Sequence, residues 1–440
     1  MADRRVAITG IAVVSALGIG REAYFQGLWE GAIGLDRIRA FDPGGFPSQV
    51  AGEVAQLKIN DFVPKTQRKA TKLMSRDIQL AVAAADQAVR DAQLKTKGSC
   101  PEDEPDIDPE RSGVNIGAGL ICCDLVELGA AVAQAIENGT FSYHKWGREG
   151  MAALTPLWLL KYLPNMLSCH ISIIHDLQGP SNSITCGESS GLLSIGEAYH
   201  TILRGKADLI IAGGAECKVN PMGLLRQCLM NRVSTRYNDN PKQACRPFDK
   251  DADGSVVAEG AGIVVLEEME RARRRGATIY AEVAGFGASN NFCNGMVELE
   301  PEGKGITLAL TKALQEANLP PHAIDLLIPH GLAVSAQDRA EARGIQAAFG
   351  ECTPRLPVFA TKSRIGNCGA GASAIDLATA VLALHHHRIP PTLNCPCPPE
   401  EYGLNIVNTK GLEKELHHVM SSCYTFGGQT AALIVSKLGE

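Results

Sequence analysis

The sequence has no run of 18 apolar residues and no charged segment followed by an apolar one near residue 1, where Met-Ala-Asp-Arg-Arg leads directly into a strand-like pattern. A membrane-spanning helix needs about 20 mostly apolar residues, and a secretory signal needs a charged part followed by an apolar part. We therefore expect a soluble, cytoplasmic protein that has no membrane as a partner.

An excess of positive charge is also missing. The chain has 42 Lys and Arg residues against 48 Asp and Glu residues, which gives a formal net charge of −6 at pH 7. Surfaces that bind nucleic acid non-specifically are basic. Nucleic acid is therefore not an expected partner.

Metal-ligand spacing is absent as well. The 14 cysteines are scattered, and Cys122 with Cys123, like Cys395 with Cys397, has no second pair at a metal-binding distance along the sequence. The three consecutive histidines at 385–387 end a helical pattern, where neighbouring side chains diverge around the axis. We expect reduced cysteines, no metal and no cofactor.

What the sequence does contain is an alternation of apolar runs with helical patterns. Its 440 residues, 45% hydrophobic with 45 glycines, suit an α/β protein with large cores. Continuous apolar runs are typical of parallel strands buried between helices. The pattern occurs twice without an intervening linker, which predicts two halves, 1–262 and 263–440, in one folding unit. The expected strands are 6–14, 113–119, 208–214, 262–267, 280–286, 325–329, 357–360 and 431–436, and the clearest helices are 77–92, 190–204, 305–317 and 338–348.

A turn near the middle of the chain carries the strongest functional signal. Residues 179–191 read Gly-Pro-Ser-Asn-Ser-Ile-Thr-Cys-Gly-Glu-Ser-Ser-Gly. They resemble the strand-to-helix turn on which β-ketoacyl-acyl-carrier-protein synthases carry a nucleophilic cysteine. In that family the nucleophile lies eight residues after the proline of a Gly-Pro pair, and here Glu188 has that spacing from Pro180. The downstream family pattern agrees without a gap at Gly191, Ile195, Gly196 and Ala198.

The resemblance covers nearly the whole chain. It includes the strand and glycine turn of 6–18, the strand and glycine end of 208–216, and the long motif from Arg246 to Glu267. It implies a thiolase-like fold with five α-β-α-β-α layers, built from two duplicated halves.

The catalytic motifs of the second half are present in altered form. His330 matches the histidine of the family's His-Gly-Thr motif, and Lys362 matches the lysine of Lys-Ser-x-x-Gly-His. Asn367 replaces the histidine of that second motif. In working members the cysteine accepts an acyl chain, and the two histidines stabilise the enolate formed when malonyl-carrier protein loses CO2. Two of these three positions therefore differ here.

Other family positions are expected to support the site. Lys362 is expected to be structural, either neutralising Glu188 or holding backbone carbonyls, while Asp376 and Glu341 position loops. Tyr424 and Phe426 fall in the family's gate over the acyl pocket. Trp146 and Trp158 lie in a region that lines the dimer interface and tunnel in the family, so they are candidates for setting chain length, with core packing as the equal alternative.

Two basic segments stand out. Carrier proteins are acidic, so the first segment is a candidate docking site for an acyl carrier protein, with a solvated helix start as the equal alternative. The second, 271–275, follows a helical pattern and is expected to complement the helix dipole. The basic residues of the first segment are Lys65, Arg68, Lys69 and Lys72.

The altered turn predicts a protein that does not condense acyl chains alone. A carboxylate is a poor nucleophile towards a thioester, although it suits a helix N-terminus, where Glu188 is expected to pair with His330. The resemblance implies a chain-length-factor type of subunit, which lacks the cysteine and pairs with an active ketosynthase in type II polyketide or specialised fatty-acid biosynthesis. The expected assembly is a heterodimer, with a homodimer as the alternative.

Two other functions stay open. A malonyl-carrier-protein decarboxylase would need its enolate-stabilising pair, and both Asn367 and the charge of Glu188 count against it. An active 3-oxoacyl synthase would need Cys186 as the nucleophile, which requires two compensating insertions or deletions around the turn.

Overall fold

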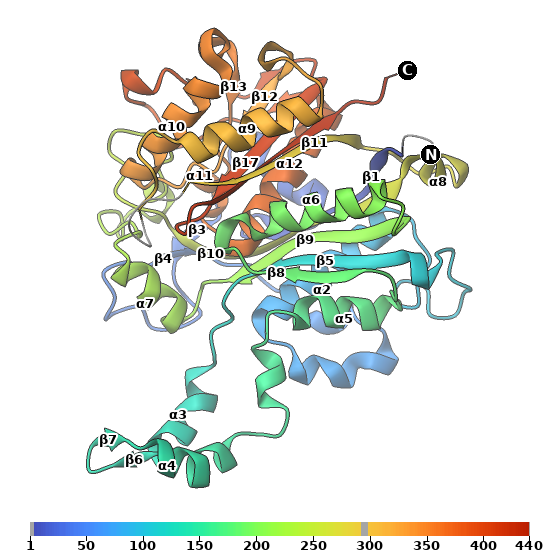
Figure 1. Cartoon of the computed structure of the whole chain (residues 1–440). Coiled ribbons are helices and arrows are strands. Elements are labelled where there is room, and N and C mark those ends of the chain that lie inside the picture. Colours follow the sequence, from blue (N-terminus) through green and yellow to red (C-terminus); the bar gives the residue numbers. More distant parts are fainter. Residues whose placement is uncertain (1–3, 292–297, 440) are drawn as a thin grey trace.

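One long mixed sheet runs through the protein and consists of two parts joined edge to edge (Figure 1). The structure, a computed structural model, describes residues 4–291 and 298–439. The parts meet where β1 pairs with β11 through Ala7 opposite Glu282 and Ile8 opposite Ala281. In spatial order the first part contains β8 (Ser181–Ile184), β5 (Ser112–Ala118), β9 (Leu209–Cys217), β10 (Val257–Glu268) and β1 (Val6–Ser15). The second contains β11 (Ala281–Asn290), β18 (Gln429–Ser436), β17 (His418–Tyr424), β12 (Leu326–Ile328), β13 (Pro357–Val358) and β15 (Asn405–Ile406).

The expectation of parallel strands was only partly correct. The six central strands, from β9 through β10, β1, β11 and β18 to β17, pair antiparallel, and the pairs further out are parallel. The apolar runs arise because helices cover both faces of the sheet, whatever the direction of the strands. The predicted division at 262/263 falls inside β10, a continuous strand, and stays a prediction.

Helices form the remaining layers. The helices α2 (Arg76–Asp91) and α5 (Met166–His175) pack on one side of the first part of the sheet. On its other side α6 (Ser190–Leu203) and α12 (Ala372–His386) lie between the two parts and contact strands of both. Beyond the second part, α9 (Lys304–Glu316) packs on β11 and β18, and α10 (Ser335–Phe349) packs on α9. Figure 1 shows this order of layers, which is the expected five-layered arrangement.

The composition of α12 explains its central place. Residues 372–384, mostly Ala, Leu, Ile and Val, are all buried, so this stretch has no solvent-exposed face, and its polar side chains Ser373, Asp376 and Thr379 have partners inside the protein. A mostly apolar helix without a polar outer face is stable only inside a protein. Its Ser373 accepts a hydrogen bond from the backbone N–H of Leu192 in α6 at 3.0 Å, which joins the two central helices.

Several short elements complete the chain. A segment around 120–165 extends away from the layered body and carries α3, β6, β7 and α4 (Figure 1). Trp146 and Trp158 lie in this segment, are only partly buried, and contact the rings of Phe141 and Tyr162, respectively, in a tilted arrangement. No helix within the described ranges is long and apolar enough to span a membrane. The bounds are α1 (Arg21–Glu30), α3 (Leu125–Gln134), α4 (Tyr143–Lys145), α7 (Pro221–Leu229), α8 (Met269–Arg274), α11 (Lys362–Ile365), β2 (Gly18–Ile19), β3 (Leu35–Arg37), β4 (Val50–Gly52), β6 (Ile136–Glu137), β7 (Thr140–Phe141), β14 (Arg388–Ile389) and β16 (Leu412–Glu413).

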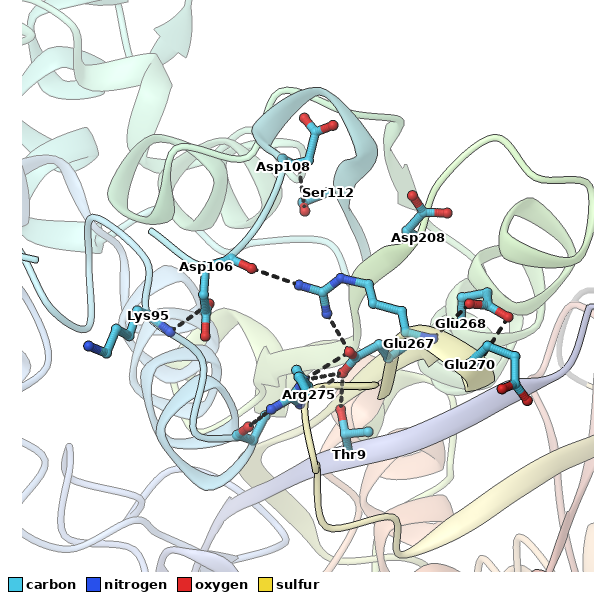
Figure 2. A network of polar contacts seen from close by, with 12 residues as sticks. Thr9, Lys95, Asp106, Asp108, Ser112, Asp208, Glu267, Glu268, Glu270 and Arg275 are labelled. Carbon is cyan, nitrogen blue, oxygen red and sulfur yellow. Dashed lines mark hydrogen bonds and ion pairs between the residues drawn. The ribbon is translucent and has the colours of Figure 1, made fainter. Parts of the chain in front are cut away.

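The basic segment 271–275 has a role beyond the one expected. Arg271 and Arg275 both form ion pairs with Glu267, a fully buried carboxylate that also accepts a 3.0 Å hydrogen bond from Thr9. Figure 2 shows Arg275 and Thr9 converging on Glu267. A buried carboxylate needs such partners. Arg271 and Arg275 therefore neutralise a side chain of β10, while Arg271, Arg273 and Arg274 lie in the last turn of α8, where basic residues were expected.

Candidate active site

A tight turn joins β8 to α6 and places Glu188 at the start of a long helix. The turn is a single 3-10 turn, Gly187–Ser189, and α6 follows at once. Gly187 has φ +54°, and a Cβ there would lie 2.3 Å from Oγ1 of Thr425, so only glycine fits. The Glu188 side chain is 0% exposed and points into the protein interior.

Four side chains donate hydrogen bonds to the Glu188 carboxylate. Oε1 accepts from Nζ of Lys218 at 3.3 Å, from Nη1 of Arg232 at 3.2 Å and from Nδ2 of Asn367 at 3.2 Å. Oε2 accepts from the hydroxyl of Thr425 at 2.5 Å. Burial by itself would raise the pKa of Glu188, but the charges of Lys218 and Arg232 outweigh it and hold the pKa well below its usual range. Glu188 is therefore an anion at neutral pH.

Sequence reasoning missed Lys218 and Arg232. They are 7% and 1% exposed, and both cations point at a carboxylate from a different part of the chain. Lys218 directly follows β9, and Arg232 lies just beyond α7. The signal that could have found them is physical: a carboxylate assigned to a buried turn requires buried cations close to it.

His330 lies beside this cluster but does not form the expected ion pair. Within the described residues no hydrogen bond joins it to Glu188; its Nδ1 lies 3.3 Å from Sγ of Cys423, and its Nε2 is buried without a partner. Burial and the nearby charge of Lys362 lower the pKa of His330 well below 6.5, so the ring is neutral. The expected Glu188–His330 ion pair is wrong because Lys218 and Arg232 supply the positive charge.

The loop that carries His330 is held by a buried carboxylate. Oε1 of Glu341 accepts from the backbone N–H of His330 at 2.7 Å, and Oε2 accepts from Gly331 at 2.8 Å. Burial raises the pKa of Glu341 to about 8 despite these two donors. The ring of Tyr424 meets His330 edge to face, with 4.7 Å between ring centroids. These contacts fix the position of the imidazole.

Lys362 forms an ion pair elsewhere in the site. Its Nζ contacts Asp376 of α12, and Asp376 also accepts a 2.5 Å hydrogen bond from Thr361. Burial would lower the pKa of Lys362, but the charge of Asp376 outweighs it and raises the pKa. The expectation that Lys362 neutralises Glu188 or holds backbone carbonyls is therefore wrong, because its charge is used by Asp376.

Phe426 connects the gate segment to the same cluster. The guanidinium of Arg232 lies 5.2 Å from the centroid of its ring. The ring also lines a cavity of about 620 Å³ that reaches Gly187 and Lys218. Thr425 and Phe426 together thus tie the loop between β17 and β18 to the turn of Glu188.

Cys186 lies two residues before Glu188, ahead of the turn. It is partly buried, its backbone N–H donates to Oγ of Ser190 at 2.7 Å, and burial raises the pKa of its thiol. A nucleophilic cysteine needs a lowered pKa. The thiol is protonated at neutral pH and lacks the environment of an activated nucleophile.

The candidate docking residues lie on the surface. They belong to a 3-10 segment, Lys65–Leu73, that precedes α2, and their side chains are exposed. Arg68 donates to the backbone oxygen of Asn60 at 3.0 Å. The four residues Lys65, Arg68, Lys69 and Lys72 thus form a basic surface that an acidic protein can reach.

The site thus combines an ionised carboxylate at the start of α6, a neutral histidine and an amide. Three of the four donors to Glu188 share Oε1 and one reaches Oε2, so the carboxylate is held from both of its oxygens. Among the described residues no cluster of His, Cys, Asp and Glu is suited to a metal ion.

Comparison with known proteins assigns the chain to a family. Residues 3–272 match the beta-ketoacyl synthase N-terminal domain, and residues 280–396 match the C-terminal domain. The chain is 35% identical to 3-oxoacyl-[acyl-carrier-protein] synthase 2 of Coxiella burnetii and 33% identical to that of Vibrio cholerae, in each case over 100% of both chains.

Solved structures agree in fold. A beta-ketoacyl synthase from Burkholderia phymatum matches with a TM-score of 0.84 at 28% identity, over 99% of this chain and 100% of that one. The ishigamide ketosynthase/chain length factor matches with a TM-score of 0.83 at 29% identity, over 100% of both chains. The structure of a type II PKS acyl-carrier protein in complex with its ketosynthase bound to the hexaketide matches with a TM-score of 0.84 at 26% identity. The match covers 99% of this chain and 100% of that one. The fold is thiolase-like, and the chain belongs to the beta-ketoacyl synthase family.

Proposed function

We propose that this chain is a non-condensing, chain-length-factor-like subunit that pairs with an active ketosynthase in the cytoplasm. The observation that carries the proposal is the Glu188 carboxylate at the start of α6, held by Lys218, Arg232, Asn367 and Thr425. In this proposal Glu188 takes the place of the family's cysteine and Asn367 that of its second histidine. A site without a thiol cannot form the acyl-enzyme on which condensation depends.

The similarity to a ketosynthase/chain length factor supports the partner role, because that protein joins the two kinds of subunit. The basic surface of Lys65, Arg68, Lys69 and Lys72 supports contact with an acyl carrier protein. The partly buried Trp146 and Trp158 lie on the projecting segment, which supports a role at a subunit interface. The partner ketosynthase performs the condensation, and this chain shapes the space available to the growing acyl chain.

A second candidate is an active synthase that uses Cys186. The curated relatives at 33–35% identity are named as synthases, which favours it. The raised pKa of the Cys186 thiol opposes it. A malonyl-carrier-protein decarboxylase is the third, and it is opposed by the negative charge of Glu188, which repels both the malonyl carboxylate and the enolate.

Mass spectrometry of the purified chain with acyl- and malonyl-carrier proteins separates these functions. We expect no covalent acylation, no CO2 loss and no 3-ketoacyl product from the chain alone, and product only when an active ketosynthase is added. Glu188→Gln is the informative variant, because it removes the repelling charge while keeping the size of the side chain. Product from the chain alone that is abolished by Cys186→Ala would overturn the proposal.

A further inference from the structure

Two nitrogen-bearing side chains meet at one carboxylate oxygen inside the Glu188 cluster. The amine of Lys218 and the amide of Asn367 both donate to Oε1 of Glu188, at 3.3 and 3.2 Å. The two nitrogens therefore lie side by side around a single oxygen atom. An amine is a nucleophile, an amide carbon is an electrophile and a carboxylate is a base, so the three groups together have a chemistry that an ion pair lacks.

These groups are shielded from water and held close to one another. Glu188 is 0% exposed, Asn367 is 3% exposed and Lys218 is 7% exposed. The Lys218 side chain passes close to the turn that follows Asn367, where a Cβ added to Gly369 would lie 2.7 Å from Cε of the lysine. The packing thus keeps the amine beside the amide, and it excludes the water that would compete with the amine.

The amide of Asn367 is oriented by two hydrogen bonds. Its Nδ2 donates to Glu188, and its Oδ1 accepts from the backbone N–H of Gly369 at 3.0 Å. A donor on Oδ1 stabilises the negative charge that develops on this oxygen when an amine attacks the amide carbon. The nitrogen that would leave already faces the carboxylate, which is the group that can bring it a proton.

The carboxylate of Glu188 is also the base that Lys218 needs. Burial by itself would lower the pKa of Lys218, but the charges of Glu188 and Glu216 outweigh it and raise the pKa, so the resting amine is an ammonium. Its proton has to pass to Glu188 before the nitrogen can attack. Groups held in contact react as if present at concentrations on the order of 10⁵–10⁸ M. A slow reaction is sufficient, because the bond has to form only once in each molecule.

We propose that Lys218 and Asn367 become joined by an isopeptide bond, with Glu188 as the group that transfers protons. Nζ of Lys218 attacks Cγ of Asn367, the Cγ–Nζ bond forms and the Cγ–Nδ2 bond breaks. Two of the three Nζ protons pass through Glu188 to Nδ2, which leaves as ammonium, and the third stays on the new amide. Nothing is oxidised or reduced, and Glu188 is regenerated as a carboxylate.

The bond would connect the end of β9 to the turn after α11, and so the first half of the chain to the second. It requires neither a partner subunit nor a carrier protein, and therefore goes beyond the proposed function. Product made by the chain alone would end the proposed function without affecting the bond, and absence of the bond would leave the proposed function intact.

Mass spectrometry of the purified, denatured chain tests the proposal. After incubation of the folded protein we expect a mass lower than that of the sequence by one ammonia, about 17 Da, because the amide nitrogen has left. A tryptic digest locates the bond. Cleavage after Lys218 is lost, and the peptide 207–226 is joined to the peptide 365–388.

Three variants separate this reaction from other losses of ammonia. Lys218→Arg keeps a cation beside Glu188 but has no nucleophilic amine, and Glu188→Gln removes the base, so both are expected to have the full mass of their sequences. Lys206→Arg changes an exposed lysine of the same region and is the matched control. It is expected to lose ammonia as the wild type does. Circular dichroism verifies that each variant is folded.

The wild-type mass alone can overturn the proposal, without reference to any variant. A wild type that keeps its full mass after prolonged incubation contains no such bond. A loss of water, about 18 Da, with Lys218 joined to Glu188 would show that the carboxylate is the acceptor instead of the amide. Loss of ammonia that persists in Lys218→Arg would come from another part of the chain, and loss that persists in Glu188→Gln would remove the assigned role of Glu188.

Discussion

Thr425 donates a 2.5 Å hydrogen bond to Oε2 of Glu188, while the other donors share Oε1 at 3.2–3.3 Å. The shortest contact to the turn thus comes from the loop between β17 and β18. A hydrogen bond to an ionised group is shorter and stronger than one between neutral groups. This bond connects the N-terminal turn to the loop that carries Phe426.

Replacing Thr425 with Val keeps the shape of the side chain and removes the donor. We expect the free energy of unfolding to fall by about 1.5–3 kcal/mol, because a buried, charged oxygen loses a direct hydrogen bond. Urea unfolding followed by circular dichroism measures the change. Thr66→Val, at an exposed position, is the control and should stay within about 0.5 kcal/mol of the wild type. Equal effects of the two substitutions would contradict the assigned role of Thr425.

Removing the charge of Glu188 should destabilise the protein more strongly. Glu188→Gln leaves Lys218 and Arg232 buried with only part of their compensating charge, and breaking a buried ion pair in this way typically costs about 3–5 kcal/mol. Urea unfolding followed by circular dichroism again measures the change in the free energy of unfolding. The triple variant Glu188→Leu, Lys218→Met and Arg232→Met replaces the whole cluster by apolar side chains and should recover most of the loss. Failure of the triple variant to exceed Glu188→Gln in stability would argue against an ionic cluster.

His175 should make stability depend on pH. It is 1% exposed, its Nδ1 lies 2.7 Å from Oγ1 of Thr96, and burial lowers its pKa to about 4. In the unfolded chain its pKa is about 6.5, so between pH 6.5 and 4 the unfolded state binds more protons than the native state. The free energy of unfolding therefore falls as the pH is lowered through this window, by about 3 kcal/mol in total.

The corresponding experiment compares unfolding at pH 7, 6, 5 and 4. His175→Gln is expected to show a shallower loss of stability between pH 7 and 4 than the wild type. His322→Gln, at an exposed position, is expected to follow the wild-type curve. Parallel curves for all three proteins would show that His175 does not titrate as described.

The basic surface before α2 predicts a charge effect on carrier-protein binding. Reversing two charges, Lys65→Glu with Lys69→Glu, should weaken acyl-carrier-protein binding about fivefold and reduce its dependence on salt, because exposed ion pairs contribute less than about 1 kcal/mol each. Surface plasmon resonance at two salt concentrations measures both effects. The matched control is Arg273→Glu with Arg274→Glu on α8, which should change neither. The docking assignment fails when both variants bind alike.

The sequence allowed much of the fold to be predicted, because burial on both faces leaves continuous apolar runs. Expected strands at 6–14, 208–214 and 431–436 coincide with β1, β9 and β18 to within a few residues. Strand direction was not predictable from these runs, since burial is the same for parallel and antiparallel strands. The expected five layers were confirmed because the family resemblance supplied the connectivity.

The candidate site was predictable only as far as local motifs reach. The turn of Glu188 has a local signature, and so do the segments of His330 and Lys362. The contacts of Lys218 and Arg232 with Glu188 join parts of the chain 30 and 44 residues apart, and no spacing rule links them. Arg271 and Arg275 differ, because they lie four and eight residues after Glu267, yet the burial of that carboxylate was not evident from the sequence.

The apolar character of α12 has a consequence for biosynthesis. Its thirteen consecutive buried residues, 372–384, supply the layer against which α6 and the first part of the sheet pack, yet they lie near the end of the chain. Ribosomes add about 5–20 residues per second. The nascent chain therefore presents the uncovered face of β9 and β10 for roughly ten seconds before α12 emerges. During synthesis this apolar face stays uncovered, and it closes only when α12 of the C-terminal half has been made.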